Sequence, residues 1–138
     1  MNKKYENGLI IIALSKAFKE IHNDSLELFR EYGITLGQFA VLEALNTKGS
    51  LTIQEIIDVI LATSGNMTVL IKNLEKSKLV KKKVNPKDKR SYLVSLTSKG
   101  EELIKEVFPK HMEIISKKLE VYSPEEKVNL LELLKRLY

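Results

Sequence analysis

The most constraining feature of this sequence is a change of hydrophobic period near its middle, from the spacing of a helix to the alternation of strands. Between residues 67 and 74, apolar side chains recur three and four residues apart, which is the spacing of one buried helix face. These positions are Met67, Leu70, Ile71 and Leu74. Two β-rich runs follow almost directly, Leu79 to Val84 and Ser91 to Leu96, with the polar, turn-forming segment Asn85 to Arg90 between them. The centre of the chain is therefore predicted to be a helix followed by a β-hairpin.

A second short helix is predicted immediately before this one. Thr52 and Glu55 have the spacing of a capping box and predict a helix over residues 53–61. Thr63 or Ser64 can cap the helix that follows. Two short helices joined by a few residues form a helix-turn-helix pattern, and a hairpin directly after that pattern predicts a winged helix.

Four more helices are predicted in the remaining chain. Capping boxes at Thr35–Gln38 and Ser98–Glu101 mark two of their starts. Pro109 is expected to kink the helix that contains it, or to break that helix one residue earlier. The predicted ranges of the first three are 7–31, 35–48 and 98–119. The last helix has a predicted start at Ser123-Pro124, and its apolar residues lie between residues 128 and 137. The expected fold is mainly α, with about six helices and a small β-hairpin wing in one domain of 138 residues.

The two ends of the chain are unusually apolar. The last helix has five leucines, more than one buried stripe needs, and the segment Leu9 to Ile12 is apolar near the other end. This predicts an apolar surface that one subunit leaves uncovered, and hence a partner chain. The alternative is a monomer in which the last helix is fully buried.

Positive charge is concentrated in the predicted hairpin and the helix before it. Residues 72–99 contain nine lysines and one arginine against two acidic residues, a local charge of +8, whereas the rest of the chain carries −3 of the net +5. This asymmetry is typical of a protein that binds a polyanion. The alternative is a lysine-rich, solvated face, because 20 of the 23 basic residues are lysine.

The helix that starts at Thr63 or Ser64 and runs to about Ser77 has an outward side that fits a DNA major groove. Asparagine can form two hydrogen bonds to adenine, methyl groups of threonine and valine can contact thymine, and serine or lysine suits phosphates or guanine. The candidate contacts are Thr63, Ser64, Gly65, Asn66, Thr68, Val69, Lys72 and Asn73. The alternative is that these small polar residues only solvate a surface helix.

The hairpin offers a second set of candidate DNA contacts. Arg90 is one of three arginines in the chain, and a guanidinium enters a narrow, electronegative minor groove more readily than an ammonium does. Asp88 is expected to hold that side chain by a charge-assisted hydrogen bond. Alternation places Lys81 and Lys83 on the side opposite the valines of the first strand. The candidate wing contacts are Lys81, Lys83, Lys87, Asp88, Lys89 and Arg90.

Other classes of function have no support in the sequence. The absence of cysteine excludes disulfides, thiolate zinc sites and thiol switches. The two histidines lie on different predicted helices, and no catalytic, phosphate-binding or dinucleotide motif is present, so we expect no enzyme activity, cofactor or metal. The longest apolar run, Leu9 to Leu14, has six residues, far from the roughly 20 of a membrane span. We therefore expect a cytoplasmic protein without a membrane partner.

The segment Ser64 to Lys99 resembles the helix-turn-helix and wing of the MarR (multiple antibiotic resistance regulator) family. The marks of this resemblance are Asp88-x-Arg90, Leu96-Thr97 and Lys99-Gly100, preceded by Gly33-Ile34-Thr35-Leu36 with Gln38-Phe39. Two positions depart from the family's pattern, because Lys78 stands where glycine is common and Lys82 where arginine is common.

The resemblance implies a homodimeric, ligand-responsive repressor or activator that binds a pseudo-palindromic DNA operator. Residues 33–98 would form the DNA-binding lobe, and residues 1–32 and 99–138 the dimerisation helices. The effector would be a small aromatic or lipophilic compound held where these parts meet. The candidate lining residues are His22, Leu26, Phe29, Phe39 and His111. The main alternative is a winged-helix protein-interaction module whose basic wing docks an acidic partner.

Overall fold

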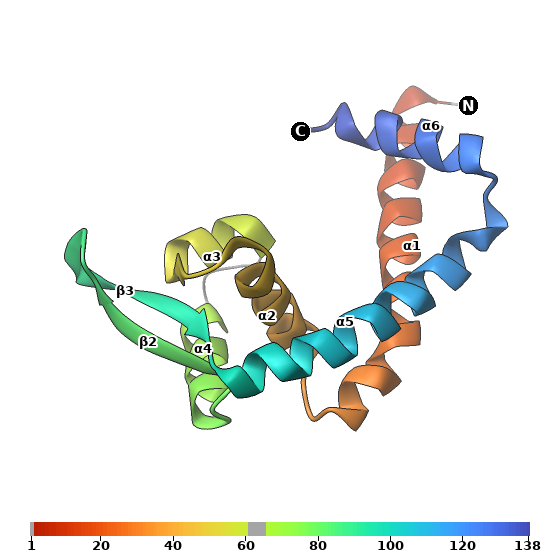
Figure 1. Ribbon diagram of the computed structural model, residues 1–138. Coiled ribbons are helices and arrows are strands. Elements are labelled where there is room, and N and C mark those ends of the chain that lie inside the picture. The colour runs from red at the N-terminus through yellow and green to blue at the C-terminus, as the bar shows by residue number, and fades with distance from the viewer. Residues whose placement is uncertain (1, 61–65) are drawn as a thin grey trace.

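The computed structural model describes residues 2–60 and 66–138, and it has the predicted mainly α architecture with a small antiparallel sheet. The elements are α1 (Lys3–Glu31), α2 (Leu36–Lys48), β1 (Leu51–Thr52), α3 (Ile53–Ile60), α4 (Met67–Lys76), β2 (Val80–Asn85), β3 (Asp88–Leu96), α5 (Ser98–Lys118), the 3₁₀ helix η2 (Leu119–Val121) and α6 (Pro124–Lys135). In Figure 1, α2, α3, α4 and the hairpin form one lobe, and α5 leads away from it toward α1 and α6. None of the helices in these two ranges is both long and apolar enough to cross a membrane.

The helix starts follow the predicted capping chemistry at two positions. The Thr35 hydroxyl accepts a hydrogen bond from the Gln38 amide, and the Gln38 side chain accepts one from the Thr35 amide. Thr52 and Glu55 form the same reciprocal pair at 3.1 and 3.2 Å. Each box satisfies amide donors that have no partner within the helix, and a single N-cap of this kind contributes about 1 kcal/mol to helix stability.

Helix α5 differs from the prediction at its start and in its middle. Its N-cap is Thr97, whose hydroxyl accepts from the Gly100 amide at 3.1 Å, so the predicted capping box at Ser98 is wrong by one residue. The helix also continues through Pro109 to Lys118, so the alternative in which it breaks there is wrong. The side chains of Val107 and His111, on either side of the proline, are both buried. This packing offsets the one hydrogen bond that the proline cannot donate.

The sheet has the order β1-β3-β2, and all its pairs are antiparallel. The two-residue strand β1 was not predicted; Leu51 pairs with Val94. The turn of the hairpin is also shorter than predicted, because Asn85 already pairs with Asp88 and only Pro86 and Lys87 lie between the strands. Three of the predicted wing contacts, residues 88–90, therefore belong to strand β3.

One apolar core joins the lobe of α2, α3, α4 and the hairpin to α1 and α5. Its fully buried members come from five helices and the hairpin, which fixes the position of α4 relative to the rest of the lobe. The largest are Phe29, Leu42, Ile56, Met67, Ile71, Leu74, Ile104, Val41, Val94 and Val107. Helix α6 contributes no buried residue to this core.

Candidate nucleic-acid interface

Helix α4 presents the polar side that its sequence predicts. Met67, Ile71 and Leu74 are buried against the core, and Leu70 is half-buried. The exposed residues on the other side are Asn66, Thr68, Val69, Lys72 and Asn73, all candidate DNA contacts. The first turn has no acidic residue to repel a phosphate. The remaining candidates, Thr63, Ser64 and Gly65, lie outside the described residues.

The turn after α4 sets the direction of the wing. Lys78 has a φ of 61°, a left-handed conformation that glycine adopts more easily, and it occupies the position where the sequence departs from the family pattern. Its carbonyl accepts a hydrogen bond of 2.6 Å from the Thr97 hydroxyl, and the Lys99 ammonium donates to the Ser77 carbonyl at 3.1 Å. The start of α5 thus holds the end of α4. The sequence alone did not indicate this contact.

The wing presents its cations on two sides. In the register of the two strands, Lys81 lies opposite Ser95, and Lys83 lies opposite Leu93. Both lysines are exposed on the side away from the core. Lys82 is on the core side, where its Nζ lies 3.1 Å from Glu75 Oε1 of α4. The charge of Lys82 is therefore balanced by α4 itself, whereas Lys81 and Lys83 have no ion-pair partner among the described residues.

Asp88 and Arg90 interact as predicted near the end of the hairpin. The Asp88 carboxylate accepts from the Arg90 amide at 3.0 Å and from Arg90 Nε at 3.4 Å. The carboxylate therefore restrains both the backbone and one end of the guanidinium. The Arg90 side chain is 94% exposed, so its terminal nitrogens face solvent. Lys87 and Lys89 are exposed beside it.

The residues predicted to line an effector cleft meet where α1, α2 and α5 pack together. The ring centroids of Phe29 and Phe39 lie 4.8 Å apart, and that of His111 lies 5.2 Å from Phe29 and 4.7 Å from Phe39. His22 lies at the edge of this group, 6.5 Å from His111. Leu26 lies outside the ring cluster and lines, with Phe29, an open cavity of about 380 Å³. Because Phe29 and Phe39 are buried, their own rings fill the centre of the predicted cleft.

Sequence reasoning missed the buried polar contact of this cluster. The Ser25 hydroxyl and His111 Nδ1 are hydrogen-bonded at 2.8 Å, and both residues are buried. Burial lowers the pKa of His111 below its usual 6.5, and the neighbouring His22 lowers it further. The imidazole is therefore neutral near pH 7. Serine at this position of α1 gave no sequence signal, because its partner is 86 residues away.

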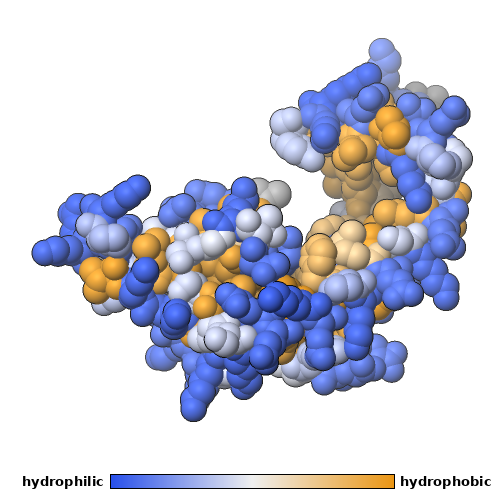
Figure 2. All heavy atoms as spheres, viewed as in Figure 1, coloured by the Kyte–Doolittle hydropathy of each residue, from blue (hydrophilic) through white to orange (hydrophobic). Residues whose placement is uncertain are grey.

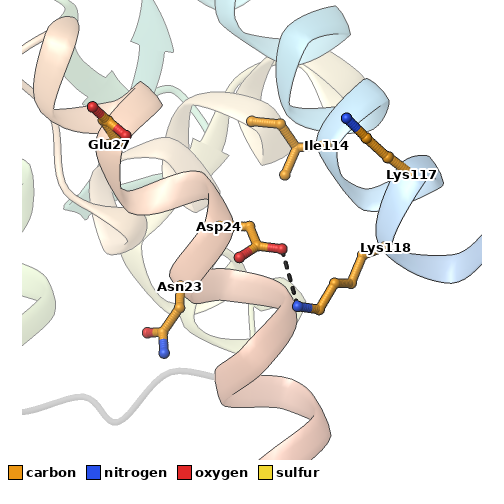
Figure 3. Close-up of a pocket in the computed structure, with 6 residues that line it drawn as sticks. All are labelled: Asn23, Asp24, Glu27, Ile114, Lys117 and Lys118. Carbon is orange, nitrogen blue, oxygen red and sulfur yellow. Dashed lines mark ion pairs between the residues drawn. The ribbon is translucent and has the colours of Figure 1, made fainter.

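A polar groove of about 580 Å³ separates α1 from α5 farther along the two helices (Figure 3). Lys118 lies 3.2 Å from Asp24 Oδ2 and 3.4 Å from Glu20 Oε2, and these two contacts raise the pKa of Lys118. These two ion pairs of Lys118 connect the outer part of α5 to α1. Among the described residues, no three His, Asp or Glu side chains are grouped so that they could hold a metal ion.

Comparisons with known proteins agree with this architecture. A family model described as the transcriptional regulator SarA/Rot matches residues 25–107. MhqR, an HTH-type transcriptional regulator of Bacillus subtilis (strain 168), is 35% identical over 128 residues, which cover 93% of this chain and 88% of MhqR.

Two solved structures extend the comparison to the whole fold. A mutant of MarR from E. coli complexed with operator DNA is 26% identical, with a TM-score of 0.77 over 92% of this chain and 94% of that chain. NadR in complex with 4-hydroxyphenylacetate is 26% identical, with a TM-score of 0.80 over 93% of this chain and 91% of NadR. The chain belongs to the MarR family of winged helix-turn-helix transcription regulators, which bind DNA and are not enzymes.

Proposed function

We propose that this regulator is a homodimeric, ligand-responsive repressor that binds a pseudo-palindromic operator in the cytoplasm. The observation that carries the proposal is the uncovered apolar surface of the terminal helices, which Figure 2 shows along α1, α5 and α6. The exposed apolar residues of α1 and α6 are Leu9, Ile10, Ile11, Ile12, Val128, Leu130, Leu131, Leu133 and Leu137. A second copy that covers this surface makes residues 1–32 and 99–138 the dimerisation part and residues 33–98 the DNA-binding lobe.

A two-fold dimer of this kind presents two copies of α4 to one face of a duplex. Asn66, Thr68, Val69 and Asn73 would contact base edges, while Thr63, Ser64, Gly65 and Lys72 would contact phosphates or guanine. The wing would contribute Arg90 to the adjacent minor groove, with Asp88 holding its side chain and the exposed lysines 81, 83, 87 and 89 on phosphates. The complex of an E. coli MarR mutant with operator DNA supports the binding of an operator.

The effector would bind at the junction of α1, α2 and α5. His22, Leu26, Phe29, Phe39 and His111 offer aromatic faces and ring nitrogens that suit a small aromatic or lipophilic compound. The complex of NadR with 4-hydroxyphenylacetate supports this class of ligand. Because Phe29 and Phe39 are buried, a ligand would have to displace their rings, and this would change how α2 packs on α1 and α5.

Selection of bound duplexes from a random pool tests the proposal directly. We expect an inverted repeat whose half-site centres lie about 34–36 Å apart, one helical turn of B-DNA. Sedimentation of the purified protein at micromolar concentration should give a dimer. A strictly monomeric protein, or a selected site without two-fold symmetry, would contradict the proposal.

A further inference from the structure

The outer half of the wing exposes an apolar and aromatic pair on its core side. Val84 and Tyr92 face each other across β2 and β3, and their side chains are 53% and 52% exposed. Val80 and Val94 lie on the same side nearer the base of the hairpin and are 3% and 0% exposed. This side of the hairpin therefore packs against the body only at its base, because the outer half of the hairpin projects past the helices (Figure 1).

Lys82 connects this pair to α4. Its Nζ lies 5.9 Å from the centroid of the Tyr92 ring and 3.1 Å from Glu75 Oε1. The ammonium therefore holds the ring from the base side by a cation–π contact, while its charge is balanced by the carboxylate of α4. The phenol hydroxyl of Tyr92 makes no hydrogen bond to the part of the chain that the structure describes, so it can act as an uncharged donor on this side of the outer wing.

The geometry of a duplex places a sugar–phosphate strand at this point. Adjacent major and minor grooves are separated by one backbone strand. If α4 enters a major groove and Arg90 the neighbouring minor groove, that strand passes between them. Tyr92 lies two residues from Arg90 on β3, on the side of the wing that carries the contact to α4. The surrounding segment, residues 72–99, carries a charge of +8 and attracts a polyanion.

We propose that Val84 and Tyr92 form a contact site for the DNA backbone. The Tyr92 hydroxyl donates a hydrogen bond to a phosphate oxygen, and Val84 packs beside the ring against the adjoining deoxyribose. The site rests on the docking mode proposed above. It adds an uncharged hydrogen-bond donor to the positively charged side chains through which the wing would contact DNA. Such a contact positions the wing on the duplex and carries no base specificity.

The test measures binding of the full-length protein to the selected operator and to a scrambled duplex of equal length, by fluorescence anisotropy at several salt concentrations. Loss of a hydrogen bond to a charged group in Tyr92→Phe should raise Kd about tenfold to a hundredfold on both duplexes. The slope of log K against log salt should stay unchanged, because no cation is lost. Lys83→Gln, on the opposite side of the wing, should instead flatten that slope by about one unit.

Thr47→Val is the control, because it removes an exposed hydroxyl of α2 that is neither a candidate DNA contact nor part of the proposed dimer interface, and it should leave Kd unchanged. The site is refuted if Tyr92→Phe binds both duplexes as tightly as the wild type, if only operator binding weakens, or if the salt slope changes. A failure of the proposed docking mode would give a different result from a failure of the Tyr92 contact. Arg90→Ala without effect, together with weaker binding by Tyr92→Phe, would retain the backbone contact and refute minor-groove insertion.

Discussion

Arg90 extends from the end of the hairpin beyond the carboxylate of Asp88, with its terminal nitrogens in solvent. If it enters a minor groove, Arg90→Ala should cost about 1–3 kcal/mol of operator affinity. Lys81→Ala, which removes a phosphate contact, should weaken binding to all sequences alike and flatten the salt slope by about one unit. Anisotropy titrations on operator and scrambled duplexes distinguish the two effects, and equal losses for Arg90→Ala on both duplexes would contradict its role in recognition.

His111 makes the stability of the protein depend on pH. Its pKa is lowered in the folded state by burial and by His22, so the unfolded chain takes up a proton first as the pH falls below about 6.5. The free energy of unfolding should therefore fall below pH 6.5, by at most about 1.4 kcal/mol per pH unit from this group, and level off below the folded-state pKa.

Urea denaturation of the wild type and His111→Gln between pH 5 and 7.5 measures this contribution. The variant should be less stable at pH 7.5, because the packing of the imidazole among Phe29 and Phe39 is lost, but its stability should decline less as the pH falls. Parallel pH profiles for the two proteins would show that His111 does not carry the effect.

At the scale of elements, the start of α5 packs closely against the segment that leads from α4 into the wing. A side chain at Gly100 would overlap the backbone carbonyl of Leu79, which leads into β2. Gly100→Ala should therefore destabilise the protein by about 1–3 kcal/mol, as overpacking does elsewhere. Thermal unfolding followed by circular dichroism measures the change.

Gly8→Ala is the matched control for this substitution. Gly8 lies within α1 with open space around it, and alanine is favoured over glycine inside a helix by about 1 kcal/mol. Gly8→Ala should thus be neutral or stabilising. If the two variants unfolded at the same temperature, the close approach of α5 to the wing would not limit stability.

Elements that depend on residues close together in the sequence could be predicted, whereas elements that depend on distant residues could not. The starts of α2 and α3 follow from capping boxes that join residues three positions apart, and the buried side of α4 follows from its period. Strand β1 has only two residues, and it exists because Leu51 meets Val94 from a distant part of the chain. A local pattern contains no information about such a pair.

At the scale of the whole molecule, the uncovered leucines of α6 link dimerisation to operator binding. A substitution in α6 that prevents dimerisation should therefore also weaken operator binding. Leu131 is 51% exposed, so Leu131→Glu should leave the subunit folded while placing a charge in the proposed interface. We expect a monomer in sedimentation experiments and a loss of operator affinity of about 10²-fold or more, because two linked half-sites bind far more tightly than one.

Asn129→Glu adds the same charge at a polar position of the same helix and should remain dimeric. Circular dichroism would establish that both variants are folded. A Leu131→Glu protein that stays dimeric and binds the operator normally would place the interface elsewhere on the molecule.

Most of the architecture followed from interactions between near neighbours in the chain. Hydrophobic period, capping pairs and the turn-forming segment were sufficient for the six helices, the hairpin and the polar side of α4, because these depend on residues a few positions apart. The Asp88–Arg90 contact was predictable for the same reason.

Contacts between segments that are distant in the sequence determined the features that the sequence did not predict. The packing around Pro109, the Ser25–His111 bond, the tie from Lys118 to α1 and the exposure of Val84 and Tyr92 all depend on where remote helices and strands end up. Their free energy comes from burial and from pairs that form only when the chain is folded, so no periodicity within one segment encodes them.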